Sequence, residues 1–247
     1  MKEEKIKLSV VIPAYNEEKR IGPTILDIDH YLSSQDYISE ILVVIDGATD
    51  KTAQVVKKYE GMVQNLRIID NTENHGKGYV VRQGLLEARG QFRLFMDADN
   101  STTVNHIEKA FPYFEKEFSL VIGSRDLKGS EITEHQAQWK ESLGNLGNLM
   151  IQFLGGLWGI PDTQCGFKVL SSEAVRKICP LMRIDRWGFD IEMLVLAKRL
   201  NFKIKEFPVE WKNDAESKVS LGSYFQTFKE LLQIRLNVWT GKYGKME

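Results

Sequence analysis

The chain has 247 residues and a formal net charge of −1 at pH 7, with 27% charged and 43% hydrophobic residues. This length suits one large α/β domain, or a domain with a small appendage, and the composition is that of a soluble globular protein. The near-neutral charge gives no support for nucleic acid as a partner. Two cysteines, Cys165 and Cys179, are too few for a disulfide framework or a zinc site and favour a reducing compartment.

Strand and helix patterns alternate through the first half of the chain. The N-terminus is charged and leads directly into a predicted strand, without the apolar region of a signal peptide, so we expect no secretion. The alternation predicts an α/β fold with a mostly parallel sheet, helices on both faces and right-handed crossovers. The predicted strands cover residues 6–12, 40–45, 66–70, 91–96 and 119–123, and the predicted helices cover residues 17–33, 50–60, 76–89 and 105–118.

The pattern changes after Arg125. Residues 126–138 are polar and without periodicity, which predicts a long loop. The uncharged stretch 142–161 carries a one-sided apolar stripe, which indicates a buried or membrane-surface helix and not a membrane span. Further helices are predicted at 171–179 and 190–200, a strand at 203–206, and a final helix from about Ser223. We therefore expect one domain over 1–221 and a C-terminal amphipathic helix over 222–247.

The most informative segment is the run 92–100, in which a short apolar strand ends in two carboxylates, Asp97 and Asp99. Ligands of open α/β sheets bind just outside the carboxyl ends of such strands. Two carboxylates at that place suit Mg²⁺ or Mn²⁺ that already carries phosphate oxygens. The alternative is a solvated aspartate turn at the end of a strand.

Polar segments follow each of the five predicted strands, and parallel strands would bring all of them to one edge of the sheet. This arrangement predicts a nucleotide crevice, with Tyr15 for a base, Glu17 and Asp46 for its N–H groups and ribose hydroxyls, and Lys77 and Arg125 for phosphates. Each segment also has a structural alternative: Asn16 as a helix N-cap, a turn at Asp46, or a flexible helix entry at Lys77. Neither a P-loop nor a G-x-G-x-x-G motif is present, which disfavours P-loop enzymes and dehydrogenases. The segments are PAYNE, DGATDKT, NHGKG, DAD and GSR.

The order VVIPAYNEE, VIDGATDKT, NHGKG, FMDADNST and IGSR resembles that of family 2 glycosyltransferases, which have a GT-A (Rossmann-like) fold. Three later strings, DTQCGFK, RWGFDIE and SKV, are similar to those of dolichyl-phosphate β-glucosyltransferases and microbial polyprenyl-phosphate glycosyltransferases. The likeness covers roughly residues 8–240. It implies a nucleotide-sugar donor such as UDP-glucose, inversion at the anomeric carbon, and a dolichyl or polyprenyl phosphate acceptor.

The resemblance also implies roles for individual residues. One departure is that the family often has two adjacent acids before Gly47, whereas here the first of them is Ile45, so Asp46 is the only acid. The implied nucleotide-binding residues are Pro13, Ala14, Tyr15, Glu17, Asp46, Lys77, Asp97 and Ala98. The implied metal ligands are Asp97, Asp99 and Ser101. The residues expected near phosphates are Arg125 and Lys218.

The identity of the acceptor decides whether a general base is needed. An alcohol acceptor requires one, and Asp190 and Glu192 are the candidates, although Asp190 could instead cap a helix. A lipid phosphate is already an anion at pH 7 and needs positioning cations more than a base. The candidates for contact with the acceptor phosphate are Gln164, Lys168 and Lys218. Cys165 is expected to be a small buried apolar residue and not a nucleophile.

The C-terminal segment fits a lipid acceptor. Basic residues and an apolar stripe that includes Phe225 and Trp239 suggest an amphipathic helix at a bilayer interface, with core packing as the alternative. We expect peripheral contact with the cytoplasmic face of a membrane. Two other functions remain open, which are transfer to a sugar hydroxyl in polysaccharide or glycolipid synthesis and a non-catalytic nucleotide-sugar-binding module.

Overall fold

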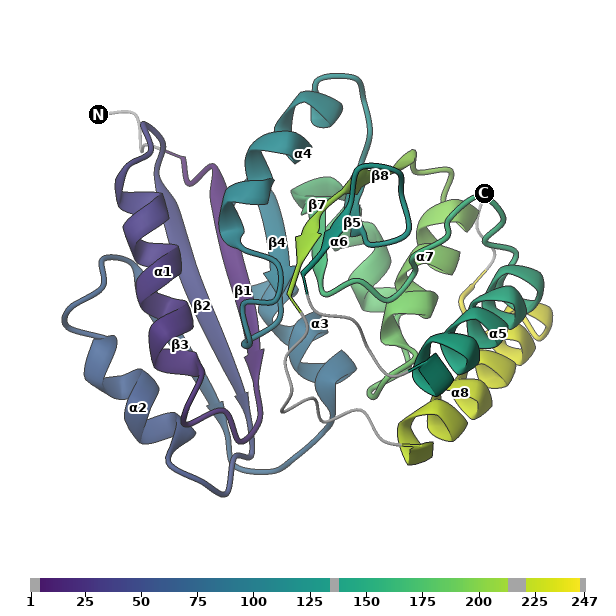
Figure 1. Cartoon of the computed structure of the whole chain (residues 1–247), viewed down its shortest axis with the longest axis horizontal. Coiled ribbons are helices and arrows are strands. Elements are labelled where there is room, and N and C mark those ends of the chain that lie inside the picture. Colours follow the sequence, from purple (N-terminus) through teal and green to yellow (C-terminus); the bar gives the residue numbers. More distant parts are fainter. Residues whose placement is uncertain (1–4, 134–137, 213–220, 245–247) are drawn as a thin grey trace.

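A seven-stranded sheet in the order β3-β2-β1-β4-β7-β5-β8 forms the centre of the molecule (Figure 1). The computed structural model describes residues 5–133, 138–212 and 221–244. All strands of this sheet run parallel except β7, which pairs antiparallel with both β4 and β5. The strands are β1 (Leu8–Ala14), β2 (Ser39–Asp46), β3 (Leu66–Asn71), β4 (Phe92–Met96), β5 (Leu120–Ser124), β7 (Phe167–Ser171) and β8 (Ile204–Pro208).

Alternating side chains of the central strands feed two separate hydrophobic cores. On β1, Val10 and Ile12 join the core under α1, α2 and α4, whereas Val11 joins the core under α3, α6 and α7. This is the period-two pattern of a strand that is covered on both faces. The helices are α1 (Ile21–Ser33), α2 (Thr52–Tyr59), α3 (Lys77–Glu87), α4 (Ile107–Phe114), α5 (Gln138–Gly155), α6 (Ser172–Ile178), α7 (Phe189–Arg199) and α8 (Leu221–Trp239).

The expected mostly parallel sheet with helices on both faces is confirmed, with shorter helices than expected at two places. Helix α1 begins at Ile21 and not at residue 17, because the backbone N–H groups of Arg20 and Ile21 both donate to the carbonyl of Glu17 in a turn. Before α4, the 3-10 helix η1 (Val104–His106) takes the first residues of the predicted helix.

Strand β7 corrects the predicted topology. The sequence patterns gave no strand at residues 167–171, yet this segment lies between β4 and β5 in the middle of the sheet. Because β7 is antiparallel, its first residues lie at the edge where the parallel strands end. The loop expected at 126–138 also contains a short strand, β6 (Glu131–Ile132), which pairs with β9 (Glu210–Trp211).

Helices α5 and α8 lie side by side and both pack on α7, outside the helices that cover the sheet (Figure 1). Helix α8 contributes Leu231 and Ile234 to the same core as α7. The amphipathic C-terminal helix thus has a buried face as well as an exposed one. Among the described residues, no helix is both long and apolar enough to cross a membrane.

Candidate active site

The polar loops that follow β1 to β5 meet at one edge of the sheet, as expected from parallel strands. The segment before β7 joins them, because this strand runs in the opposite direction. The backbone N–H of Asp97, just after β4, donates to the carbonyl of Gly166 at 3.2 Å. The DTQCGFK string therefore lies beside the Asp97–Asp99 pair.

The two aspartates after β4 face a lysine from the start of α3. Lys77 Nζ lies 2.6 Å from Asp97 Oδ1, and both side chains are partly exposed, at 26% and 33%. Burial alone would lower the pKa of Lys77, but the charges of Asp97, Asp190 and Asp99 outweigh it and raise this pKa. Burial, and then the neighbouring Asp97, raise the pKa of Asp99. The edge of the sheet therefore holds clustered carboxylates that favour a cation.

The turn that carries Asp99 is fixed by its own hydrogen bonds. Asp99 Oδ1 accepts the backbone N–H of Ser101 at 2.9 Å, and Asn100 has a left-handed backbone with φ of 54°. Ala98 is buried, and its carbonyl accepts the hydroxyl of Thr24. No group of three or more His, Cys, Asp or Glu side chains within the described ranges is arranged to hold a metal. Within the described ranges, this turn thus offers the carboxylates of Asp97 and Asp99, and phosphate oxygens of a ligand would complete a metal site there.

Asp46, at the end of β2, holds the NHGKG loop. Its carboxylate accepts the backbone N–H groups of His75 at 2.7 Å and Gly76 at 2.9 Å, and the side-chain amide of Asn74 at 2.9 Å. Asp46 is only 3% exposed. In the structure Asp46 therefore supports the loop that positions Lys77.

The segment after β1 is tied to the loop after β2. Pro13 and Ala14 are buried at the strand end, whereas Tyr15 is 40% exposed at the edge. Asn16 has a left-handed backbone and accepts the backbone N–H of Thr49 at 2.8 Å through its side-chain oxygen. Asn16 is therefore not the N-cap of α1, which begins after Arg20. Glu17 forms an ion pair with Arg20 at 2.6 Å.

Arg125, after β5, forms a two-pronged ion pair with Asp162. Its Nε and one terminal nitrogen each lie 2.8 Å from a carboxylate oxygen, and its backbone N–H donates to the same side chain at 2.9 Å. Asp162 is 4% exposed, and the neighbouring Arg125 lowers its pKa although burial opposes this. Arg125 was expected near phosphates, but in the structure its charge is matched by Asp162, so its evident role is to anchor the segment that leads into β7.

Lys168, expected at an acceptor phosphate, lies in the interior of the protein. Its side chain is fully buried, and Nζ donates to the carbonyl of Cys165 at 2.6 Å and to Asp190 Oδ1 at 2.5 Å. Cys165 is buried as expected, and burial raises its pKa to about 12.

Asp190 lies next to the site, in the first turn of α7. It is the second residue of the helix, two after the N-cap residue Gly188, so Asp190 is not the N-cap of α7. Burial raises its pKa, while Lys168 and Lys77 oppose this. Because Lys77 also pairs with Asp97, the carboxylate of Asp190 belongs to the charged cluster around Asp97.

Glu192, expected as one of two candidate general bases, lies in the core, and its oxygens accept hydrogen bonds. It is 0% exposed and accepts the hydroxyl of Tyr243 at 2.6 Å and the backbone N–H groups of Arg183 and Ile184 at 3.0 and 2.9 Å. Glu230 of α8 similarly accepts the backbone N–H of Gly188 at 2.6 Å. These two glutamates hold the loop between α6 and α7 in place.

This loop packs directly on the lysine-bearing turn. The carbonyl of Asp185 accepts the backbone N–H of Tyr79, and a Cβ at Gly78 would lie 2.6 Å from the carbonyl oxygen of Ile184. The RWGFDIE string is therefore mainly a support for the start of α3. Of the other two residues expected at the acceptor phosphate, Gln164 is exposed at the edge and Lys218 lies outside the described residues.

Gly166 was not identified from the sequence as a site residue. A Cβ at this position would lie 2.0 Å from Asp97 Oδ2, which is closer than any real contact. Only glycine lets the carboxylate of Asp97 take its place against β7. Gly166 belongs to the DTQCGFK string. The residue that leaves no room for a Cβ at this position is Asp97, 69 residues earlier in the chain, so the sequence alone did not indicate the role of the glycine.

Comparisons with known proteins agree with this arrangement. The family model for glycosyl transferase family 2 matches residues 9–179. A dolichyl-phosphate beta-glucosyltransferase of Trichomonas vaginalis is 35% identical over 251 residues, which cover 95% of this chain and 76% of that protein. The protein of the same name from Saccharomyces cerevisiae is 35% identical over 263 residues, covering 98% and 78%.

A solved structure shows the same fold. Glucosyl-3-phosphoglycerate synthase from Mycobacterium tuberculosis, in complex with Mn²⁺, uridine diphosphate and glucosyl-3-phosphoglycerate, aligns with a TM-score of 0.68 at 20% identity, covering 93% of this chain and 80% of that one. The expected GT-A architecture is therefore confirmed. With the family model matched over most of its length and relatives at 35% identity across nearly all of it, this chain belongs to glycosyl transferase family 2.

Proposed function

We propose that this glycosyltransferase moves a hexose, with inversion, from a nucleotide sugar to dolichyl or polyprenyl phosphate, and that the donor is UDP-glucose. The observation that carries this proposal is the pair Asp97 and Asp99 beside Lys77 at the ligand-binding edge of the sheet. The names of the relatives support glucose as the sugar and dolichyl phosphate as the acceptor.

A divalent cation, Mg²⁺ or Mn²⁺, fits the donor set at this edge. Asp97 and Asp99 offer hard carboxylate oxygens as ligands, and a cation would reduce the repulsion between their two negative charges. Ser101 is tied to Asp99 through its backbone and remains a further ligand candidate. When bound, such a cation would compensate the negative charge that builds up on the leaving diphosphate.

The residues of the chain itself supply binding and orientation. Lys77 projects a second positive charge toward the same place, where it would bind the diphosphate. Tyr15 offers an exposed aromatic ring for the base. Glu17 and the Asp46-supported loop would line the nucleoside pocket, next to the buried end of β1 at Pro13 and Ala14.

A lipid phosphate acceptor fits the site better than a sugar hydroxyl. Of the two acids considered as base, Glu192 is buried and Asp190 is already paired with Lys168. An anionic phosphate needs no proton removed, so it does not depend on a free base among the described residues. Gln164, exposed in the segment before β7, and Lys218 remain the candidates for contact with this phosphate.

A lipid acceptor implies that the enzyme works at a membrane surface. The exposed side of α8 carries Phe225, Leu232, Leu236 and Trp239, between 45% and 71% exposed. Such a helix can lie in a bilayer interface. Peripheral association with the cytoplasmic face is therefore part of the proposal.

The experiment that tests donor and acceptor together is incubation of the protein with labelled UDP-glucose, GDP-mannose or UDP-N-acetylglucosamine and a short polyprenyl phosphate. We expect label in the lipid fraction with UDP-glucose and divalent metal. Label on a sugar hydroxyl acceptor instead would overturn the lipid-phosphate assignment. Donor binding without transfer to any acceptor would indicate a non-catalytic nucleotide-sugar-binding module.

Gly166→Ala is expected to lower kcat/KM for the donor about 100-fold, because the new methyl group must displace the carboxylate of Asp97, and a shift of about 1 Å at a reacting site has this effect. Steady-state kinetics at varied donor concentration measure it. The matched control is Gly61→Ala, since a Cβ there has nothing within 4 Å. Normal kinetics of the Gly166 variant would show that Asp97 is not needed in its observed position.

Lys218→Ala is expected to cost more activity than Asp190→Asn if the acceptor is a lipid phosphate, because a cation that positions an anionic nucleophile matters more than a base. If a hydroxyl is the nucleophile, the order reverses, with a loss of roughly 10²–10⁴-fold for the base variant. The measurement is the rate at saturating donor with a short polyprenyl phosphate. Thermal unfolding of both variants serves as control, because Asp190 also has a buried partner.

A further inference from the structure

The loop between α6 and α7, residues 182–188, packs around the turn that carries Lys77. Lys77 follows Gly76, and a Cβ on this glycine would lie only 2.4 Å from the carbonyl oxygen of Asp185. The side-chain nitrogen of Lys77 lies 6.0 Å from the centre of the Trp187 ring, which belongs to the same loop. A shift of the loop would therefore displace Lys77.

The C-terminal end of the described chain holds this loop from the other side. Tyr243 is 2% exposed and donates its hydroxyl to Glu192 Oε1 at 2.6 Å, and Asn237 donates to the same hydroxyl oxygen at 3.3 Å. Glu192 in turn accepts the backbone N–H groups of Arg183 and Ile184 at 3.0 and 2.9 Å. Burial raises the pKa of Glu192, whereas the hydrogen bonds from Tyr243 and from the loop lower it. The tyrosine hydroxyl therefore favours the ionised carboxylate that binds the loop.

A second buried glutamate, Glu230 of α8, holds the other end of the loop. One of its oxygens accepts the backbone N–H of Gly188 at 2.6 Å, and the other accepts the side-chain amide of Gln226 at 2.8 Å. A Cβ on Gly188 would lie 2.8 Å from the Cβ of Glu230, so this glycine lets α8 approach the loop closely. The loop is thus bound near both of its ends by glutamates that contact the C-terminal segment, residues 221–244.

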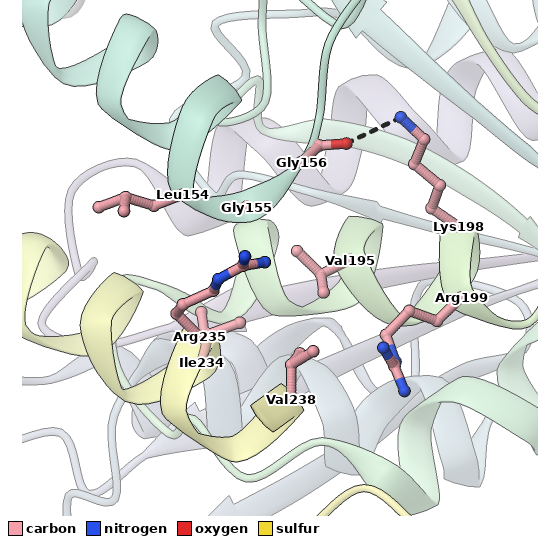
Figure 2. A pocket seen from close by; sticks show the side chains of 9 residues that line it. All are labelled: Leu154, Gly155, Gly156, Val195, Lys198, Arg199, Ile234, Arg235 and Val238. Atoms are coloured by element: carbon pink, nitrogen blue, oxygen red, sulfur yellow. Dashed lines mark hydrogen bonds between the residues drawn. The ribbon is translucent and has the colours of Figure 1, made fainter. Parts of the chain in front are cut away.

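Apolar packing does not fill the contact between α8 and α7. Figure 2 shows the place, where Ile234 and Val238 of α8 and Val195 of α7 line a cavity of about 170 Å³. This volume is well above the roughly 10–15 Å³ that holds one water molecule, whereas protein interiors have few voids larger than that. The apolar side chains leave α8 room to shift, so the hydrogen bonds of Glu230 and Tyr243 are needed to fix the C-terminal segment.

We propose that Tyr243 is a positioning residue for sugar transfer, which acts through Glu192 and the loop of residues 182–188 on Lys77. Loss of its hydroxyl removes a hydrogen bond from the buried carboxylate and loosens the loop, so that Lys77 is held less firmly. The inference rests on the proposed function, in which Lys77 binds the diphosphate of the donor. The C-terminal segment is then a working part of the transferase site and not a separable appendage.

Amide hydrogen exchange tests the structural coupling without donor or acceptor. Tyr243→Phe keeps the ring and removes only the hydroxyl. We expect the amide of Tyr79, which donates to the carbonyl of Asp185 on the loop, to exchange at least tenfold faster in this variant. The amides of β2 in the same sample report global unfolding and should be unchanged. The matched control is Tyr31→Phe, which removes a hydroxyl that donates to Glu108 at 2.5 Å and should not affect Tyr79.

A double-mutant cycle with Lys77 tests the consequence for sugar transfer. Tyr243→Phe should lower kcat/KM for the donor about tenfold. This is less than the roughly 100-fold that a 1 Å misplacement can cost, because Arg183 and Ile184 still bind Glu192. In a Lys77→Met background the same change should have less than a twofold effect, since two changes that act through one group are not additive. If Lys77→Met leaves no measurable turnover, the Kd of uridine diphosphate gives the same comparison.

Unchanged exchange at Tyr79 in the Tyr243 variant would overturn the proposal, and so would equal losses with and without Lys77. Equal acceleration of the β2 amides would also overturn it, because the hydroxyl would then serve global stability alone. Glu192→Gln is the second variant and should reproduce both results if Tyr243→Phe folds poorly. If the parent transfers no sugar from any of the three nucleotide sugars, the proposed function fails, while the exchange result still decides whether the C-terminal segment holds the lysine-bearing turn.

Discussion

Asp99→Ala is expected to reduce metal-dependent sugar transfer by about 10²–10³-fold while leaving the fold intact. The loss is that of a group which stabilises developing negative charge in a preorganised site. The fold should survive because Asp99 lies in a turn after β4, where it accepts a hydrogen bond from Ser101 of the same turn. Its pKa is raised by burial and by Asp97, so removing it also relieves repulsion between two carboxylates.

The measurement combines turnover over a range of Mg²⁺ or Mn²⁺ concentrations with thermal unfolding. Glu60→Ala is the matched control, because it removes an exposed carboxylate at the end of α2. We expect the control to show parental kinetics. Near-normal turnover of the Asp99 variant, at any metal concentration, would show that the metal assignment is wrong.

The architecture and the location of the site were predictable because both follow from local patterns. Short apolar runs that end in polar residues mark buried parallel strands, and the parallel arrangement alone brings their ends together. The loops after β1 to β5 therefore lie where the sequence placed them. Two neighbours at this edge, Lys77 and Asp97, even form a direct ion pair, although they are 20 residues apart.

The buried charges were not predictable, since charged side chains are normally exposed and only a distant partner reveals the exception. Lys168 lies in the middle strand β7 because Asp190, 22 residues later, accepts its charge. Glu192 is buried because Tyr243, 51 residues later, and two backbone N–H groups satisfy it. Because its five-residue run contains a lysine, β7 was not predicted as a strand. The two most specific strings, DTQCGFK and RWGFDIE, thus contain residues that support the structure around the site as well as candidates for ligand contact.

Lys168→Met is expected to lower the free energy of unfolding by about 3 kcal/mol or more, because it leaves the carboxylate of Asp190 buried without its main partner. For a chain of this length, 3 kcal/mol corresponds to a decrease in Tm of roughly 6–12 °C. Lys203→Met is the matched control, because Lys203 forms an exposed pair with Glu117 at 3.0 Å, and such pairs contribute little. A double variant, Lys168→Met with Asp190→Asn, should recover most of the lost stability.

The same variant should respond to pH with a defined sign. Burial already raises the pKa of Asp190 above its ordinary value, and removal of Lys168 raises it further. Between the unfolded and the folded pKa, the folded protein binds more protons, so its stability falls as pH rises through this window and is regained as pH falls. Thermal unfolding from neutral to mildly acidic pH should therefore show the gap between the Lys168 variant and the parent narrowing as pH falls. A gap that stays constant, or a double variant no more stable than the single one, would mean that Asp190 is not the group that the buried lysine compensates.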